Sequence, residues 1–276
     1  MGLLDGQYAS MTTGRSMDFD DLRSYVPGDD VKDIDWKSSA RAGELLIKSY
    51  RAERRHTLAF VVPTGGSLAS AATLTHSKID VVLATIGVLA WVACHQGDYV
   101  TVIAPGKDGP SVARPSYRDT QIEHMLAGLD AGCRLEAPDP DLVELLDLTA
   151  SGLRRRCIVV VVLDDWDPRP ADVDALASLC ARHEVLAIEV SDLDLTDPAL
   201  AAVPTRDQAS GQPVPGFVAR DRQVREQAVA ARQERARRRG HTLDRLGIIH
   251  ESVADVDDSI AAIVRLLERM RHASRH

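Results

Sequence analysis

The sequence predicts an α/β protein, with a mostly parallel sheet that has helices on both faces. From residue 56 onward, short apolar runs rich in Val and Ile alternate with segments of helical period. The apolar runs show no polar alternation, as expected for strands whose two faces are both covered by helices. Such strand–helix alternation is typical of a parallel sheet. We therefore predict one α/β domain over residues 56–276, preceded by a β-rich extension over residues 1–55.

The predicted strands are short, apolar and rich in β-branched residues. The extension before them is polar, is punctuated by Gly and Pro, and ends in an alternating run at residues 45–50. In the α/β domain the predicted strands are residues 58–62, 99–104, 157–163, 185–190 and a final short run at 246–250.

Helical spacing fills the segments between the strands. Residues 77–93 are apolar all round, as a core-facing helix should be. Asp139 and Pro140 supply an N-cap and a proline at the first helical position of the next predicted helix. Pro170 opens another, and apolar residues at helical spacing predict a last helix. These are Ile260, Ile263, Val264, Leu267 and Met270.

Residues 197–216 interrupt this pattern before the last helix. They contain four prolines and no apolar run of helical or strand period. We expect a long loop or a short hairpin there.

Composition excludes several classes of protein. With 276 residues, 45% of them hydrophobic, the chain can form a core that needs no disulfides. A formal charge of −8 argues against general nucleic-acid binding. The four cysteines form no CxxC pair, which favours reduced thiols over a disulfide framework or a zinc site.

The distribution of apolar residues predicts a cytoplasmic protein. The N-terminus has neither the basic nor the apolar region of a signal peptide. The most membrane-like stretch, residues 81–94, has 14 residues, whereas a helix needs roughly 20 to cross a bilayer. A buried helix explains this stretch better than a membrane span.

An acidic, turn-rich motif occupies residues 23–41, which read RSYVPGDDVKDIDWKSSAR. Its four central acids can be interpreted as a catalytic or metal site, because clustered carboxylates bind hard cations. The interpretation we favour is that the acids cap turns and pair with nearby arginines, while Trp36 anchors the segment to the core. The acids are Asp29, Asp30, Asp33 and Asp35.

The motif resembles the hallmark of the bacterial "domain of unknown function 58" family, R-x-Y-x-P-G-D-D-x-R-x-I-D-W-x-x-x-A-R. Lys32 replaces the usual Arg. The resemblance implies that a von Willebrand factor A-like (Rossmann-like) domain follows, and that the protein acts as partner or adaptor of a MoxR-type AAA+ ATPase. We expect the matching residues to be structural or partner-binding. They are Arg23, Tyr25, Pro27, Gly28, Asp29, Asp30, Asp35, Trp36 and Arg41.

The resemblance also implies where a divalent cation would bind. Von Willebrand factor A domains hold Mg²⁺ or Mn²⁺ with Asp-x-Ser-x-Ser after the first strand, a Thr from a later loop and an Asp after the fourth strand. The corresponding positions here are Pro63, Gly65, Ser67, Thr120 and Asp165. Because the leading carboxylate is missing and Mg²⁺ needs charge from the protein, we expect a degenerate site without metal or other cofactor.

Two alternatives to a metal-free adaptor remain open. The first is a Mg²⁺- or Mn²⁺-dependent protein-binding module, with an ion held by Ser67, Asp165 and Thr64. Acids at residues 164–167 can equally end a strand and shape a turn before Pro168. The second alternative is a hydrolase that uses the acids of residues 29–35.

An arginine-rich segment lies at residues 220–240, with eight arginines and three acids. Its pattern predicts an amphipathic helix with a basic face. This face can dock on an acidic partner or nucleic acid. We favour a surface helix whose last arginines, Arg237 to Arg239 before Gly240, complement the helix dipole.

No catalytic motif is found in the sequence. It contains no G-x-S-x-G elbow, no HExxH pair and no glycine-rich phosphate loop. We therefore predict that the protein is not an enzyme, and that it is a scaffold or adaptor with a protein partner and without nucleic acid.

Overall fold

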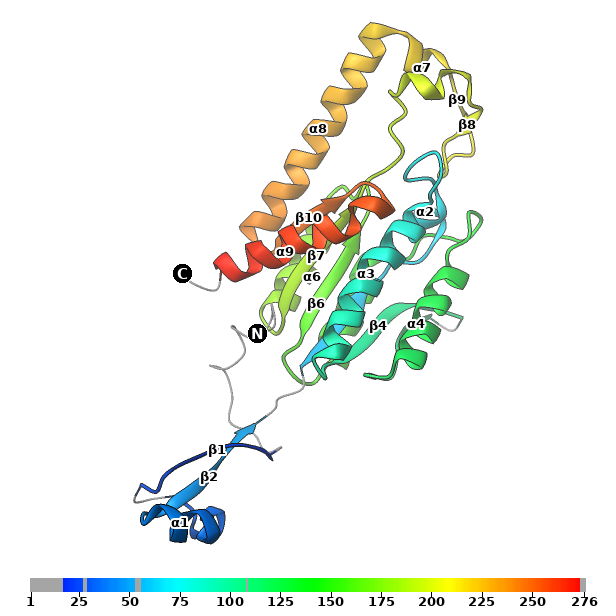
Figure 1. Ribbon diagram of the computed structural model, residues 1–276. Coiled ribbons are helices and arrows are strands. Elements are labelled where there is room, and N and C mark those ends of the chain that lie inside the picture. Colours follow the sequence, from blue (N-terminus) through cyan, green and yellow to red (C-terminus); the bar gives the residue numbers. More distant parts are fainter. Residues whose placement is uncertain (1–16, 27–28, 53–55, 108, 274–276) are drawn as a thin grey trace. The chain divides into compact units, whose positions relative to one another are not determined.

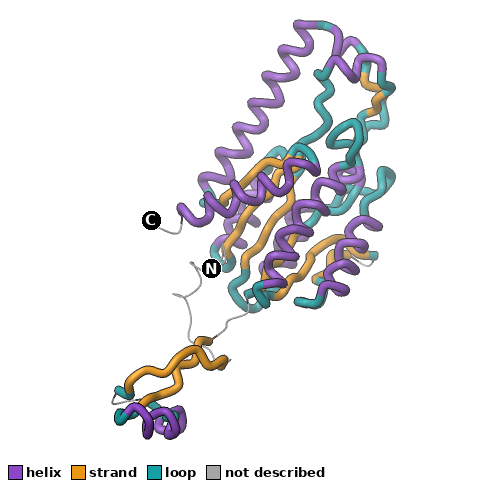
Figure 2. Tube along the Cα trace, viewed as in Figure 1, coloured by secondary structure: helices purple, strands orange, loops and turns teal. Residues whose placement is uncertain are grey.

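The computed structural model describes residues 17–26, 29–52, 56–107 and 109–273. The chain divides into two compact units, Met1–Arg55 and His56–His276. Each unit has its own secondary structure and is described by itself (Figures 1 and 2).

The first unit is built on an antiparallel pair of strands, β1 (Met17–Ser24) and β2 (Leu46–Ala52). Between them lie a 3-10 turn, η1 (Val31–Asp33), and a helix that was not predicted, α1 (Trp36–Ala42). Asp35 caps α1 by accepting a hydrogen bond from the backbone N–H of Ser38, and Gly43 ends it with a φ of +74°. Pro27 and Gly28 of the family motif lie outside the described residues.

The second unit contains a six-stranded sheet in the order β10-β7-β6-β3-β4-β5. The pairings between neighbours are parallel, except that β5 runs antiparallel at the edge. The predicted mixed α/β fold with a mostly parallel sheet is thus confirmed. The strands are β3 (Thr57–Val61), β4 (Tyr99–Gly106), β5 (Gly109–Val112), β6 (Ile158–Leu163), β7 (Glu184–Val190) and β10 (Ile249–Val253).

Helices cover both faces of this sheet (Figure 1). One layer comprises α3 (Lys78–His95), α4 (Asp119–Gly132) and α9 (Ser259–Ala273). The other includes α5 (Leu142–Gly152) and α6 (Pro170–Cys180). Every residue of β6 is buried. Because successive strand residues face opposite sides, Val159 and Val161 pack with α5 and α6 in one apolar cluster.

The remaining elements follow the strands or lie between β7 and β10. Of the long loop or short hairpin expected at residues 197–216, the structure has a short hairpin, formed by β8 (Thr205–Arg206) and β9 (Pro213–Val214). The predicted basic helix is α8 (Arg222–Arg245). The short elements are α2 (Gly66–Ala69), η2 (Pro198–Ala202), α7 (Phe217–Arg220) and η3 (Val256–Asp258).

Three local predictions need correction. The last strand begins at Ile249, not at residue 246, because Leu246 caps α8 and Gly247 turns the chain with a φ of +70°. The helix predicted to start from Asp139 is capped by Asp141, whose carboxylate accepts from the backbone N–H of Val143. The edge strand β5 and the helix α4 were not predicted.

The strand order creates a switch point between β3 and β6. The chain leaves β3 towards β4 on one side, and it later returns to place β6 on the other side. Loops that follow the carboxyl ends of two such strands diverge, and ligands of open α/β sheets bind in the crevice between them. This crevice lies at the ends of β3 and β6.

Among the described residues, one helix, α3, is long and apolar enough to cross a membrane. Half of its 18-residue window is buried inside the protein, as in the core helix that the sequence predicted. A single helix of this kind is weak evidence for a membrane span.

Candidate functional site

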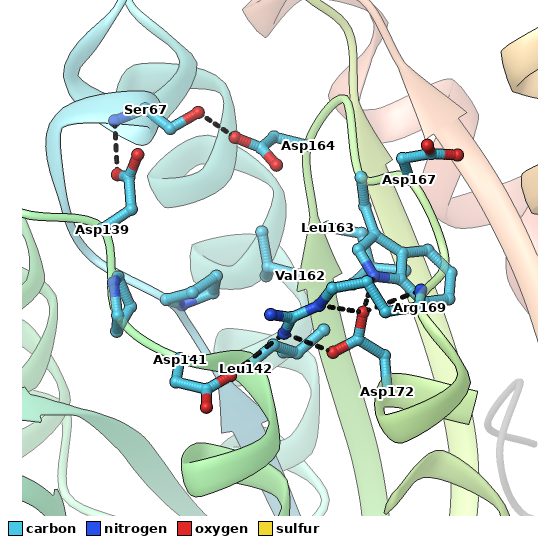
Figure 3. Close-up of a pocket in the computed structure, with 13 residues that line it drawn as sticks. Ser67, Asp139, Asp141, Leu142, Val162, Leu163, Asp164, Asp167, Arg169 and Asp172 are labelled. Atoms are coloured by element: carbon cyan, nitrogen blue, oxygen red, sulfur yellow. Dashed lines mark hydrogen bonds and ion pairs between the residues drawn. The ribbon is translucent and has the colours of Figure 1, made fainter. Parts of the chain in front are cut away.

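A cavity of about 460 Å³ opens at the switch point. Three loops line it: residues 63–67 after β3, residues 139–142 before α5, and residues 162–172 around the end of β6. Figure 3 shows the acidic side chains among the residues that line it, which come from the second and third of these loops. The predicted degenerate positions Pro63 and Ser67 are both in its lining.

The loop after β3 packs tightly against the loop before α5. The Ser67 backbone N–H donates to Asp139 Oδ1 at 2.7 Å, and the Gly66 N–H donates to the Ala137 carbonyl at 3.1 Å. A Cβ atom on Gly65 would lie 2.9 Å from the Pro138 carbonyl oxygen and 3.0 Å from the Asp139 Cα. Glycine at position 65 is therefore required by the close approach of the two loops.

A buried lysine reaches the same place from the start of α3. The Ser67 hydroxyl donates to the Asp164 carboxylate. The Lys78 ammonium lies 3.3 Å from Ser67 Oγ and 3.5 Å from Asp164 Oδ2, and it also donates to Asp192 Oδ1. The Lys78 side chain is only 2% exposed. One ammonium thus links the ends of β3, β6 and β7.

Two predicted metal-site positions lie elsewhere. Asp164, and not Asp165, bonds to Ser67, because Asp165 turns away to pair with Arg239 and Arg235. Thr120 is an exposed residue in the first turn of α4 and is not in the cavity lining. Thr120 belongs to α4, a helix that the sequence did not predict. The loop that contacts Ser67 is the one before α5, and it contributes Asp139.

Thr64, which the metal-dependent alternative uses, is buried. Its backbone N–H donates to the Val62 carbonyl at 2.8 Å. The structure brings Ser67 and Asp164 together, and it places Asp165 in a separate ion-pair group.

A buried carboxylate orders the other side of the cavity. Asp172 accepts hydrogen bonds from Arg169 Nε at 3.0 Å and Trp166 Nε1 at 3.1 Å (Figure 3). Burial alone would raise the pKa of Asp172, but these hydrogen bonds outweigh burial and lower it. The same guanidinium also donates to Asp141 at 3.0 Å. Asp172 therefore holds the loop after β6 in place.

The arginine-rich helix α8 binds acids at the ends of β6 and β7. Arg239 donates to Glu189 at 3.0 Å and to Asp165 at 2.8 Å. Arg238 pairs with Asp167 and Arg232 with Asp194. The interpretation of Arg237 to Arg239 as residues that complement the end of the helix is wrong, because α8 continues to Arg245 and Arg239 is buried. Part of the basic face therefore has an intramolecular role.

His250 extends this buried ion group. Its Nδ1 lies 2.9 Å from Glu189 Oε1, and this hydrogen bond raises the pKa of His250. Burial opposes the ionisation of Glu189, but the bonds from His250 and Arg239 prevail and lower its pKa. Asp244 and Arg269 also face His250, and their effects on its pKa have opposite signs.

We predict that part of the protein's stability is lost at alkaline pH. A histidine whose pKa is raised on folding contributes stability that is full below its ordinary pKa of about 6.5 and disappears as pH rises through the folded value. The melting temperature of the wild type should therefore fall between pH 6.5 and 9 relative to that of His250→Asn. If the melting temperatures of the two proteins change by the same amount over this pH range, His250 does not have this role.

The family motif shows one further difference from expectation. Trp36 does not anchor its segment to the core, because it is 63% exposed in the described structure. Val26 and Val31 are each 57% exposed in the same unit. Tyr25 is half-buried, Arg41 is exposed, and Arg23 lies in β1 opposite Ile47.

The donors near Ser67 do not fit a Mg²⁺ ion. Among the residues that the structure describes, no three His, Cys, Asp or Glu side chains are grouped to hold a metal. An ion about 2.1 Å from Asp164 Oδ2 would lie within about 5.6 Å of the Lys78 ammonium, since that nitrogen is 3.5 Å from the same oxygen. Their repulsion is about 6 kcal/mol at an effective dielectric of 20.

Sequence reasoning missed Lys78, Asp139 and Asp192. The sequence pattern indicates a helix cap at Asp139, and it places Lys78 in an otherwise apolar helix. A signal was available for Lys78, because it is the one basic residue within the predicted helix 77–93. A charged group in a core-facing helix needs a partner.

The chain is similar in sequence to a protein family and to proteins of known sequence. Residues 21–238 match the family model described as "Protein of unknown function DUF58". An uncharacterized protein of Mycobacterium tuberculosis is 29% identical over 219 residues, which cover 76% of this chain and 66% of that protein. The chain therefore spans about two thirds of the length of this relative.

The solved structures that match the chain share little sequence with it. BatB from Bacteroides thetaiotaomicron is 15% identical, with a TM-score of 0.45, over 79% of this chain and 100% of that one. A von Willebrand factor type A structure from Catenulispora acidiphila is 14% identical, with a TM-score of 0.35, over 64% of this chain and 42% of that one.

Proposed function

The chain belongs to the DUF58 family of proteins of unknown function, and on this premise we propose that it is a non-enzymatic adaptor that binds a protein partner without a metal ion. The proposed partner is a MoxR-type AAA+ ATPase in the cytoplasm. The type of partner rests on the resemblance of residues 23–41 to the family hallmark. The binding role rests on an observation in the same residues.

That observation is an exposed apolar surface on the family motif. Three apolar side chains each expose more than half of their surface: Trp36, Val31 and Val26. Burial of such side chains would stabilise the protein. Exposed apolar patches mark interaction sites, and Trp is among the residues most enriched at the energetic centres of interfaces. A motif that presents these side chains to solvent supports a docking role.

The acids of the motif support a structural role rather than hydrolysis. Three of the four accept a hydrogen bond from a backbone N–H: Asp29 from Val26 at 3.0 Å, Asp30 from Lys32 at 3.0 Å, and Asp35 from Ser38 at 2.9 Å. Turn and helix caps use Asp in this way. These carboxylates shape the loop and helix that present Trp36.

The test is affinity capture from the native cell with three tagged proteins: wild type, Trp36→Ala and Trp91→Ala. Trp91 is the matched control, because it is 58% exposed and lies on α3 of the second unit. We expect the wild type and Trp91→Ala to recover an AAA+ ATPase. Trp36→Ala should recover at least tenfold less, since loss of such a residue costs about 2 kcal/mol or more of binding free energy.

Thermal unfolding of the same variants controls for folding defects. Replacement of an exposed tryptophan should leave the melting temperature close to that of the wild type. If Trp36→Ala captures the ATPase as well as the wild type, the motif is not the docking surface. If Trp36→Ala lowers the free energy of unfolding by several kcal/mol, as the loss of a buried tryptophan does, Trp36 is a core residue and does not support docking.

A further inference from the structure

We infer that the Lys78 ammonium is the built-in cation of the site at the ends of β3, β6 and β7, and that it excludes divalent ions even when the missing aspartate is restored. The inference deepens the metal-independent part of the proposed function and rests on it for its biological meaning. Its evidence is the geometry around Lys78.

The ammonium meets three acceptors, each from a different loop. They are the Ser67 hydroxyl after β3, the Asp164 carboxylate after β6 and the Asp192 carboxylate after β7. A lysine ammonium has three N–H donors and no acceptor. The three oxygens therefore match its full hydrogen-bonding capacity.

Burial makes this arrangement specific. The Lys78 side chain is 2% exposed, whereas those of Asp164 and Asp192 are 24% and 39% exposed. A charge removed from water must be paired, so the ammonium is bound to these carboxylates in the folded protein. A divalent ion would have to displace the Lys78 ammonium from these carboxylates. The displaced ammonium is buried, so water could not take the place of its lost partners.

The backbone prevents Lys78 from moving away easily. Its own N–H donates to the Ser70 carbonyl at 2.8 Å. The preceding residue, Ser77, is the N-cap of α3 and forms a capping box with Asp80. Both ends of the Lys78 residue are therefore held, the backbone by the start of the helix and the ammonium by the two carboxylates.

This geometry separates two causes for the loss of metal binding. If the substitution at Pro63 were the main cause, Pro63→Asp would restore a site with Ser67 and Asp164. If Lys78 is the main cause, that variant gains a carboxylate but keeps the competing cation. The three loops are then linked at any concentration of divalent ion.

The experiment uses Mn²⁺ alone as probe, with wild type, Pro63→Asp, Lys78→Met and the double variant. Electron paramagnetic resonance of free Mn²⁺ gives Kd, and thermal unfolding with and without Mn²⁺ gives stabilisation. We expect the double variant to bind Mn²⁺ saturably and at least tenfold more tightly than Pro63→Asp. Equal binding by Pro63→Asp and the double variant, or saturable binding by the wild type, would overturn the inference.

Reductive methylation of the wild type gives a second measurement that does not depend on how the variants fold. Mass mapping should find Lys32, Lys37 and Lys107, which are exposed, methylated at a stage when Lys78 is unmodified. Methylation of Lys78 at the rate of the exposed lysines would show that its ammonium is free. Failure to capture a partner would leave the Mn²⁺-binding and methylation results unchanged, so the two proposals can fail separately.

Discussion

Arg239→Met should lower the free energy of unfolding by about 3–5 kcal/mol, because the buried Glu189 carboxylate loses its guanidinium partner and keeps only His250. The Arg239 and Glu189 side chains are each 11% exposed, and they are joined by a hydrogen bond of 3.0 Å. Loss of the guanidinium also removes one of the two ion pairs of Asp165, which keeps its pair with Arg235. Urea denaturation of the wild type and the variant, with the slope of unfolding compared, measures this effect.

Arg237→Met is the matched control on the same helix. Arg237 is 77% exposed, and its contact with Glu234 is 4.0 Å long. Exposed pairs of this kind contribute about 0–1 kcal/mol, so this variant should resemble the wild type. A loss below about 1 kcal/mol for Arg239→Met would mean that α8 is not held to the strand ends by this group.

Gly65→Ser should destabilise the protein by about 1–3 kcal/mol, the usual cost of inserting atoms into a packed site. The variant restores the first serine of the metal signature. Its Cβ would lie 2.9 Å from the Pro138 carbonyl oxygen and 3.0 Å from the Asp139 Cα. The loop before α5 must move to make room, and the hydrogen bond from Ser67 to Asp139 would weaken with it. Thermal unfolding measures the loss.

Gly128→Ser provides the control for this steric argument. Gly128 lies inside α4, and a Cβ there would meet nothing within 4 Å. Serine has a higher helix propensity than glycine, so this variant should be as stable as the wild type or slightly more so. If Gly65→Ser were equally harmless, the two loops would not be in the close contact described here.

The sheet was predictable because its signal is local. Each of the apolar runs at residues 58–62, 99–104, 157–163 and 185–190 overlaps a strand, and the burial of β6 over its full length explains why the run has no polar alternation. The edge strand β5 (Gly109–Val112) was missed, because four residues with Gly and Pro give no apolar period.

The site was predictable only in part. Pro63, Gly65 and Ser67 follow the first strand of the α/β domain, so their place at the sheet's carboxyl edge could be foreseen from the sequence. The sequence could not show that Ser67 bonds to Asp164 and not to Asp165, because neighbouring residues in a turn point in different directions. That difference depends on Arg239, which is 74 residues away from Asp165.

The α/β alternation, the family motif and the absence of an aspartate at position 63 can all be read from the sequence. Hydrophobic period and short motifs carry this information within a few residues. By contrast, the position of the α3 lysine between Asp164 and Asp192, 86 and 114 residues away in the chain, depends on the tertiary structure. A buried ammonium needs partners from whichever loops the sheet brings to it, and strand order, not local sequence, selects those loops.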